Sequence, residues 1–267
     1  MSIDINKSVK ITKITNDIIN QVDDLVVNEY SLKVIINGQN FAVLQCTPKS
    51  IENLVTGFLF SEGIINSKKD IEDLDVDIEN AFCEITLRNK DKFFMGADSA
   101  MAQKVVTTAC GRNHTINYMV VDLLGTSDDI IKPSKNYHYS YLLSLINKFN
   151  KMSETFSKTG GVHSCALADQ EKIILFEEDI GRHNALDKIV GYSVLNDISL
   201  DDKILLTSGR LSSEMVTKVI KGKFGYLLSR SAPTDKAIEL SKKFNLNLIG
   251  FARGNRMNIY NNITIST

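Results

Sequence analysis

Residues 204–251 read ILLTSGRLSSEMVTKVIKGKFGYLLSRSAPTDKAIELSKKFNLNLIGF, and this stretch decides the fold. Three short apolar segments indicate strands, at residues 204–206, 226–228 and 246–251. Two stretches between them have apolar residues at helical spacing, at residues 213–220 and 234–244. Ser212 suits the start of the first helix and Pro233 the start of the second. Such an alternation predicts an α/β domain with a mostly parallel sheet.

The same pattern begins further upstream. Residues 173–176 form another apolar strand candidate, and residues 185–195 another helix candidate. A further helix is predicted within residues 141–156 by the helical spacing of Leu142, Leu145, Ile146 and Phe149. We therefore place residues 106–267 in one α/β domain.

Residues 1–105 predict a smaller, strand-rich α+β domain around one helix. Its strand candidates are residues 32–36, 41–46 and 83–87. Asn37-Gly38 tolerates the positive φ angles of a tight hairpin turn. Ser50 can cap a helix that ends near Gly63. The acidic stretch at 70–79 is typical of a solvated surface rather than a site.

Composition limits the classes of function. The chain has 267 residues, 43% hydrophobic and 24% charged, which is enough for a sizeable core. A formal net charge of -1 argues against binding nucleic acid or anionic lipid through bulk charge, so any anion site must be local. The first residues lack the order of a signal peptide, and no apolar stretch approaches a membrane span. We expect a cytoplasmic protein that contacts neither nucleic acid nor membrane.

Arginine occurs at the end of every predicted strand of the α/β domain. The chain has 31 lysines and arginines, of which only seven are arginine. Five of those seven follow the strands, at Arg182, Arg210, Arg230, Arg253 and Arg256. The carboxyl ends of parallel strands meet at one edge of a sheet, where ligands bind. Guanidinium groups bind phosphate through two parallel hydrogen bonds, so we expect a phosphate-rich ligand.

The polar residues expected to join these arginines are His183, Ser208, Gly209, Ser229 and Ser231. The alternative is that the arginines form ion pairs with neighbouring acids or cap the strand ends. The chain contains neither G-x-x-x-x-G-K-[ST] nor a G-x-G-x-x-G motif after a strand, so the common nucleotide-binding motifs are excluded.

Cys110 is the candidate nucleophile. It lies between Thr107-Thr108-Ala109 and Gly111-Arg112, and a nearby arginine favours the reactive thiolate. Cys46 and Cys83 fit small core residues, and Cys165 fits one too, although its nearness to His163 leaves a role at a site open. With no C-x-x-C pair in the chain, neither a disulfide framework nor a structural metal is expected.

The histidines and carboxylates leave alternatives open. His163 and His183 lie beside glycine-containing turns and are better site candidates than His114 and His138, yet each fits a structural hydrogen-bonding role equally well. Nucleotide hydrolysis is a weaker hypothesis, because the only carboxylates to propose for it are Glu178, Asp179 and Asp187.

Six stretches together resemble the FdhD/NarQ family of formate dehydrogenase accessory proteins. They are LVTGFLFSEGII at 54–65, TGGVH at 159–163, EDIGRHNALDK at 178–188, SGRLS at 208–212, SAP at 231–233 and GFARG at 250–254. The resemblance extends over nearly the whole chain.

The resemblance implies a sulfur carrier. Such a protein accepts sulfur from a cysteine desulfurase as a persulfide and passes it to the bis-molybdopterin guanine dinucleotide form of the molybdenum cofactor. Formate dehydrogenase then receives the sulfurated cofactor. The family's persulfide cysteine falls on Cys110. Its cofactor-binding segment falls on Phe251, Ala252, Arg253, Gly254, Asn255 and Arg256. The resemblance also implies a cytidine deaminase-like C-terminal domain and a homodimer.

One departure from the family pattern concerns the cysteine loop. Many relatives carry C-x-x-C there, whereas this chain reads Cys110-Gly111-Arg112-Asn113. A disulfide between paired cysteines is therefore excluded at this loop. Persulfide transfer through one cysteine remains open, as does a non-catalytic chaperone that only binds the guanine-nucleotide cofactor.

Overall fold

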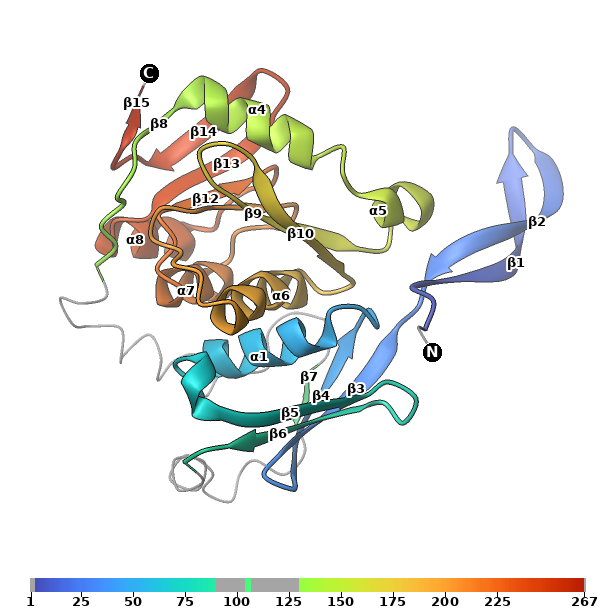
Figure 1. Cartoon of the computed structure of the whole chain (residues 1–267). Coiled ribbons are helices and arrows are strands. Elements are labelled where there is room, and N and C mark those ends of the chain that lie inside the picture. The colour runs from blue at the N-terminus through green and yellow to red at the C-terminus, as the bar shows by residue number, and fades with distance from the viewer. Residues whose placement is uncertain (1–2, 90–103, 107–129, 267) are drawn as a thin grey trace.

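The computed structural model of the chain describes residues 3–89, 104–106 and 130–266. The described residues form two large sheets, one from each half of the sequence, with helices packed between them, and two small two-stranded sheets, β1-β2 and β15-β8 (Figure 1). The fold class predicted from the sequence, an α/β domain preceded by a smaller strand-rich part, is confirmed.

The C-terminal sheet has six strands in the order β10-β9-β11-β12-β13-β14. Their bounds are β9 His163–Ala168, β10 Ile173–Asp179, β11 Ile204–Thr207, β12 Tyr226–Ser229, β13 Asn247–Arg253 and β14 Arg256–Asn261. β11, β12 and β13 are parallel neighbours, and β9 lies antiparallel between β10 and β11. Four of the six strands therefore run in one direction.

Helices cover both faces of this sheet (Figure 1). Their bounds are α4 Tyr139–Phe149, α5 Glu154–Thr159, α6 Arg182–Leu195, α7 Ser213–Lys221 and α8 Asp235–Lys243. Leu206 and Leu228 pack towards α4, while their neighbours Leu205 and Leu227 pack towards α6, α7 and α8. Side chains alternate across a strand, so these buried strands supply two cores at once.

Several details differ from the sequence prediction, among them two in the C-terminal part and the unpredicted strand β14. The expected helix over 141–156 is two helices, because the chain turns after Phe149 and Ser153 caps a new start at α5. β9 was not predicted at all. Its residues from Ser164 to Ala168 are all buried, because both faces of the strand are covered. The sequence there consists of small and apolar residues, so it lacks the alternation of polar and apolar residues by which a half-buried strand is recognised.

The N-terminal sheet has five strands in the order β5-β6-β3-β4-β7. Their bounds are β3 Tyr30–Ile36, β4 Gln39–Cys46, β5 Ile71–Asp77, β6 Phe82–Leu87 and β7 Lys104–Val106. The hairpin turn between β3 and β4 is confirmed, with φ of 50° at Asn37 and 78° at Gly38. The acidic stretch is an edge strand, β5, whose carboxylates lie mostly at the solvent-facing positions.

Helix α1 (Ile51–Glu62) joins the two halves (Figure 1). It ends at Gly63 with φ of 82°, as predicted, but the Ser50 hydroxyl donates to Glu177 Oε1 at 2.8 Å instead of capping the helix. α1 crosses α6 with the backbones in contact: a Cβ on Gly57 would lie 1.8 Å from the Asp187 carbonyl oxygen, and one on Gly191 1.8 Å from that of Asn53. Only glycine allows this approach.

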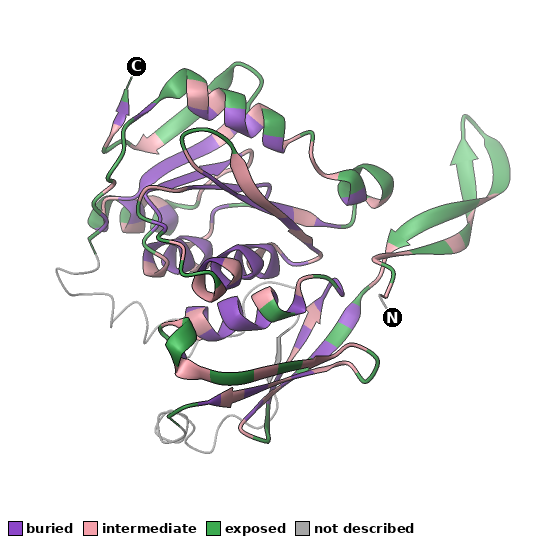
Figure 2. Ribbon diagram, viewed as in Figure 1, coloured by how far each residue is buried: buried purple, intermediate pink, exposed green. Residues whose placement is uncertain are grey.

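Three short elements and one hairpin complete the described chain. The short elements are η1 (Lys68–Asp70), β8 (Tyr137–His138) and β15 (Ile265–Ser266). The hairpin of β1 (Asn6–Thr15) and β2 (Ile18–Val27) extends away from both sheets, and nearly all its residues are exposed (Figure 2). No helix in the described ranges is long and apolar enough to cross a membrane.

The domain boundary predicted between residues 105 and 106 remains a prediction. β7 ends at Val106, and residues 107–129 lie outside the described part of the chain.

Candidate functional site

The carboxyl ends of β10 and β11 lie on either side of the first residues of β9. Asp179 pairs with His163, and Thr207 pairs with Cys165. Because β9 is antiparallel, its start meets the ends of its neighbours. His163 is thereby brought to the edge of the sheet where the arginines were predicted to gather.

Serine side chains fix the loops after β11 and β12. Ser208 Oγ accepts a hydrogen bond from the Ser164 amide at 2.9 Å. Ser231 Oγ donates to the Ser208 carbonyl at 3.0 Å, and Ser229 Oγ donates to the Gly209 carbonyl at 2.7 Å. These loop backbones are therefore held against each other and not free to rearrange independently.

The charges of three of the predicted arginines reach His163. Burial lowers the pKa of His163, and the charges of Arg182, Arg230 and Arg210 lower it further. Arg182 lies over Gly209 so closely that a Cβ there would be 3.0 Å from Arg182 Cβ. Three cations whose charges reach one imidazole form a local positive site in a chain of nearly zero net charge.

His183, in the first turn of α6, follows the same end of β10 and is partly buried, with a side chain 23% exposed. Its pKa is held well below the usual value, first by burial and then by Lys218, Arg182 and His163. Its Nε2 lies 3.5 Å from Glu214 Oε2 at the start of α7. The lowered pKa values favour the neutral form of both imidazoles, in which one ring nitrogen can donate a hydrogen bond and the other can accept one.

The segment 251–256 forms the turn between β13 and β14. Phe251 has φ of 51°, a left-handed conformation that is costly for an aromatic residue, and its amide donates to the Ser231 carbonyl at 3.0 Å. Asn147 Nδ2 donates to the Gly254 carbonyl, and the Gly254 amide donates to Asn147 Oδ1. Ala252 is buried, whereas Arg253, Gly254, Asn255 and Arg256 are exposed.

The five arginines thus divide into two groups. Arg182, Arg210 and Arg230 lower the pKa of His163 through their charges, while Arg253 and Arg256 are paired across the β13–β14 turn. The Phe251–Ser231 hydrogen bond connects the two groups through the backbone. Whether all the predicted residues bind one ligand remains a prediction.

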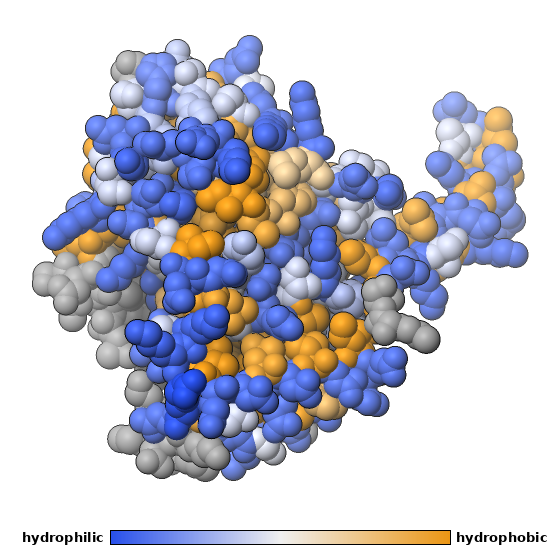
Figure 3. Space-filling model, viewed as in Figure 1, coloured by the Kyte–Doolittle hydropathy of each residue, from blue (hydrophilic) through white to orange (hydrophobic). Residues whose placement is uncertain are grey.

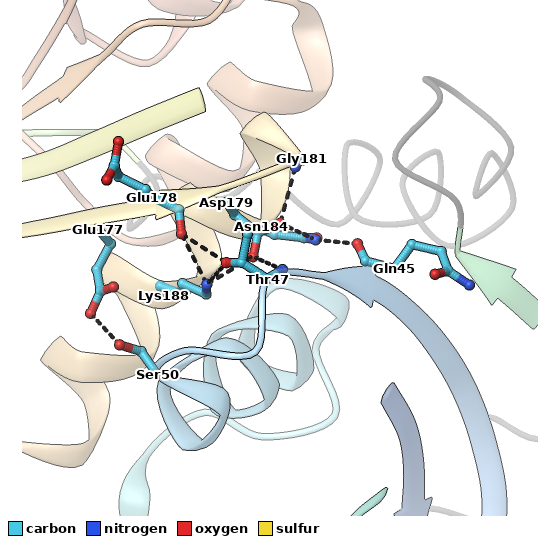
Figure 4. Close-up of polar contacts among 9 residues, drawn as sticks. All are labelled: Gln45, Thr47, Ser50, Glu177, Glu178, Asp179, Gly181, Asn184 and Lys188. Atoms are coloured by element: carbon cyan, nitrogen blue, oxygen red, sulfur yellow. Dashed lines mark hydrogen bonds and ion pairs between the residues drawn. The ribbon is translucent and has the colours of Figure 1, made fainter. Parts of the chain in front are cut away.

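The conspicuous motif at 178–188 mainly holds the two halves of the molecule together (Figure 4). Asp179 forms an ion pair with Lys188 at 2.8 Å, and both side chains are 0% exposed. Asp179 Oδ2 also accepts from the amide and hydroxyl of Thr47, each at 3.0 Å. Asn184 Nδ2 donates to Asp179 and to the Gln45 carbonyl, both at 2.8 Å.

A second buried pair involves Asp187, the residue just before Lys188 in α6. Lys218 Nζ lies 2.6 Å from Asp187 Oδ2, and Ser61 Oγ donates to Asp187 Oδ1 at 2.8 Å. Burial nevertheless raises the pKa of Asp187, against the charge of Lys218. Within the described residues no group of three His, Cys, Asp or Glu side chains could hold a metal ion. The carboxylates considered for metal-assisted hydrolysis thus include two that are engaged by lysine.

The structural reading of three cysteines is confirmed. Cys46, Cys83 and Cys165 are buried, and burial raises the pKa of each to about 12. The Cys165 thiol also donates to Thr207 Oγ1 at 3.4 Å. Cys110, Arg112 and His114 lie outside the described residues, so the prediction for Cys110 is untested by the geometry.

Sequence reasoning missed several contacts of this region. The Arg230 guanidinium lies 5.0 Å from the centre of the Phe156 ring on α5, a cation–π arrangement. Thr47 was not considered, although its hydroxyl contacts both ends of the 178–188 motif. It lies within donating distance of the Glu178 carbonyl and of Asp179, and it accepts a hydrogen bond from Lys188 Nζ. No local signal marks either contact, since the partners are far apart in sequence. An open hollow of about 510 Å³ beside Phe60, Val194 and Lys223 lies at the other end of α6 from the arginines.

The fold and this site define a class: a two-part α/β protein with several arginines where the strands of its C-terminal sheet end. Comparison with known proteins then gives the family. The FdhD/NarQ family model matches residues 27–264, and the chain belongs to that family.

Individual relatives are similar in sequence to this chain over most of their length. The chain is 39% identical over 243 residues to the sulfur carrier protein FdhD of Bacillus subtilis, covering 91% of this chain and 90% of the relative. It is 35% identical over 259 residues to the FdhD of Listeria monocytogenes, covering 96% and 97%. A crystal structure described as that of a formate dehydrogenase accessory protein from Desulfotalea psychrophila has the same fold, with a TM-score of 0.77 at 23% identity over 97% of this chain and 98% of that one.

Proposed function

We propose that this protein is a cytoplasmic sulfurtransferase that supports formate dehydrogenase. It accepts sulfur from a cysteine desulfurase on Cys110 and passes it to the bis-molybdopterin guanine dinucleotide form of the molybdenum cofactor before that cofactor enters the dehydrogenase. Membership of the FdhD/NarQ family and relatives named as sulfur carriers support the general role.

One observation supports a phosphate-bearing cofactor as the molecule that receives the sulfur. Three arginines follow β10, β11 and β12, Arg182 packs against Gly209 in the loop after β11, and the charges of all three reach His163 and lower its pKa. Guanidinium groups bind phosphate oxygens bidentately, and a neutral imidazole adds a donor or an acceptor. A cofactor with two guanine nucleotides carries several phosphates, so it matches this concentration of arginine. Arg253 and Arg256 supply two more guanidinium groups at the neighbouring turn.

The sulfur step assigned to Cys110 is a thiol exchange. The Cys110 thiolate attacks the outer sulfur of the desulfurase persulfide, an S–S bond forms at Cys110, and the desulfurase cysteine leaves as a thiolate. The remaining described thiols are poor candidates for this attack. Each is buried with a pKa near 12, so the thiolate fraction at neutral pH is very small.

Mapping the persulfide tests this assignment. The protein is incubated with a cysteine desulfurase and cysteine, and the sulfur adduct is located by mass spectrometry. We expect the adduct on Cys110, its loss in Cys110→Ser, and its retention in the matched variant Cys165→Ala. An adduct found on the other cysteines but not on Cys110 would overturn the mechanism.

The second candidate is a chaperone that binds the guanine-nucleotide cofactor without sulfur chemistry. The observation that favours it is the missing second cysteine after Cys110, where Asn113 stands instead. Complementation of a strain lacking this protein separates the two candidates through formate dehydrogenase activity. A sulfur carrier requires both Cys110 and Arg256, whereas a chaperone tolerates Cys110→Ser and fails only with Arg256→Ala.

A further inference from the structure

Phe156, on the short helix α5, contacts one of the arginines of the C-terminal sheet. The centre of its ring is 5.0 Å from the Arg230 guanidinium carbon, a cation–π arrangement. Phe156 is 39% exposed, and the exposed side chains beside it on α5 are polar, those of Glu154, Ser157 and Lys158. The surface over α5 is accordingly mainly hydrophilic in Figure 3. The exposed side chains of this helix therefore form no larger apolar patch, and the ring has a specific neighbour in Arg230.

Helix α5 is fixed at both ends, so the Phe156 ring has a defined position. Ser153 Oγ accepts from the Phe156 amide at 3.1 Å and also forms a hydrogen bond with Glu178 in β10. At the other end of the helix, the Gly160 amide donates to the Phe156 carbonyl at 2.8 Å. β9 begins three residues later with His163. One short segment therefore supplies both Phe156 and His163 to the same edge of the sheet.

The backbone on either side of Arg230 is held in place as well. Ser229 Oγ donates to the Gly209 carbonyl at 2.7 Å, and Ser231 Oγ donates to the Ser208 carbonyl at 3.0 Å. The Ser231 amide donates in turn to Ser229 Oγ at 2.9 Å. A side chain whose backbone and charged end are both held in place loses less conformational entropy when it binds a ligand.

The N–H groups of Arg230 are not used by the rest of the described chain. Within residues 3–89, 104–106 and 130–266 its guanidinium forms no hydrogen bond or ion pair. An aromatic ring stabilises the positive charge without accepting a conventional hydrogen bond, so the donors of the guanidinium group stay available for an anion. An acidic neighbour would instead occupy those donors and cancel the charge.

We propose that Phe156 is a positioning residue, which holds the Arg230 guanidinium at this edge of the sheet with its N–H donors available to a phosphate group. This role rests on the proposed function, in which the same edge binds the phosphates of a guanine-nucleotide cofactor. Phe156 acts through Arg230 and need not contact the ligand. The charge of Arg230 also reaches His163, which gives a measure of its position without any ligand.

Binding of GDP, measured by calorimetry on the full-length protein, tests this role. Phe156→Leu keeps an apolar side chain but removes the ring, so we expect the dissociation constant to rise about fivefold, the effect of a partly exposed cation–π contact. Phe156→Tyr keeps the ring and should bind GDP as the wild type does. Tyr139→Leu is the matched control, because it removes a ring that is 40% exposed at the start of α4, and it should leave the constant unchanged.

A double-mutant cycle shows whether Phe156 acts through Arg230. Arg230→Gln removes the charge and weakens GDP binding by itself. Adding Phe156→Leu to Arg230→Gln should cause no further loss, because the ring then has no guanidinium to hold. A fivefold loss both with and without Arg230 would overturn the proposal, and so would an unchanged dissociation constant in Phe156→Leu.

The titration of His163, followed by NMR without ligand, separates a failure of this proposal from a failure of the proposed function. The charge of Arg230 lowers the pKa of His163, so releasing the guanidinium in Phe156→Leu should raise that pKa, as Arg230→Gln should. Phe156→Tyr and Tyr139→Leu should leave it unchanged, and His163→Gln assigns the signal. Circular dichroism of each variant checks that the fold is kept.

A wild-type protein that does not bind GDP would count against the proposed phosphate-bearing cargo, and the titration still decides whether Phe156 holds Arg230. A raised pKa of His163 in Phe156→Leu supports the positioning role. A pKa of His163 that is the same in Phe156→Leu and the wild type overturns it.

Discussion

Replacing Lys188 by methionine removes one half of the buried ion pair that connects the two parts of the molecule. Lys188 and Asp179 are 2.8 Å apart and 0% exposed, and Lys188 also donates to Thr47 Oγ1 at 2.8 Å and to the Glu178 carbonyl at 3.0 Å. Lys188→Met therefore leaves a buried carboxylate without its counter-ion. Breaking one partner of such a pair costs about 3–5 kcal/mol of unfolding free energy.

The hydrogen bonds around Asp179 decide where in that range each variant falls. After Lys188→Met the carboxylate still accepts from the Thr47 amide and hydroxyl, from the Gly181 amide at 3.0 Å and from Asn184. We expect about 3 kcal/mol, near the lower limit. Asp179→Leu leaves the buried Lys188 charge without its counter-ion and also removes the acceptor of those hydrogen bonds. We therefore expect a loss of about 5 kcal/mol of unfolding free energy.

Urea denaturation followed by circular dichroism measures these losses. The matched control is Lys158→Met, in the exposed pair of Lys158 with Glu154, whose side chains are 3.6 Å apart and 54% and 86% exposed. That variant should change the unfolding free energy by less than about 0.5 kcal/mol. The double variant of Asp179 and Lys188 should lose less than the sum of the single variants. A cost of Lys188→Met no larger than that of the control refutes the reasoning.

Three further outcomes are expected. Arg210→Lys keeps the positive charge but loses the two parallel N–H donors of the guanidinium group, so the dissociation constant for GDP should rise about tenfold in calorimetry. Arg88→Lys, just after β6 of the N-terminal sheet, is the control and should leave that constant unchanged. Gly57→Ala places a Cβ 1.8 Å from the Asp187 carbonyl oxygen and should destabilise the fold by about 3 kcal/mol or prevent folding, as a loss of the urea transition would show. The pKa of buried His183 is lowered on folding, so the unfolded chain binds more protons below about pH 6.5 and stability should fall by up to about 1.4 kcal/mol per pH unit as the pH drops through that range. His183→Gln should flatten this dependence, and an unchanged slope would contradict the assignment.

Much of the C-terminal sheet could be predicted because its strands and helices have local signals. The apolar segments at 204–206 and 226–228 are β11 and β12, and the helix predicted at 213–220 is α7. β9 could not be predicted in this way. Its small residues are packed on both sides, and its antiparallel position between β10 and β11 depends on pairing with strands formed later in the chain.

The candidate site was predictable in its composition but not in its geometry. Arginine at the strand ends is visible in the sequence, because guanidinium is rare in this lysine-rich chain. The structure decided that the charges of Arg182, Arg210 and Arg230 reach His163 while Arg253 and Arg256 are at a separate turn. It also decided that most of the 178–188 motif is used to join two halves of the molecule.

The sequence by itself determined the alternation of strands and helices over residues 173–251 apart from β9, the core character of Cys46 and Cys83, and the choice of arginine where the strands end. Periodicity and side-chain chemistry are properties of neighbouring residues, so they can be read along the chain. Only the tertiary structure decided that Thr47 meets Asp179, 132 residues away, and that Arg230 lies on Phe156. Such contacts depend on which surfaces pack together, and no local pattern records that choice.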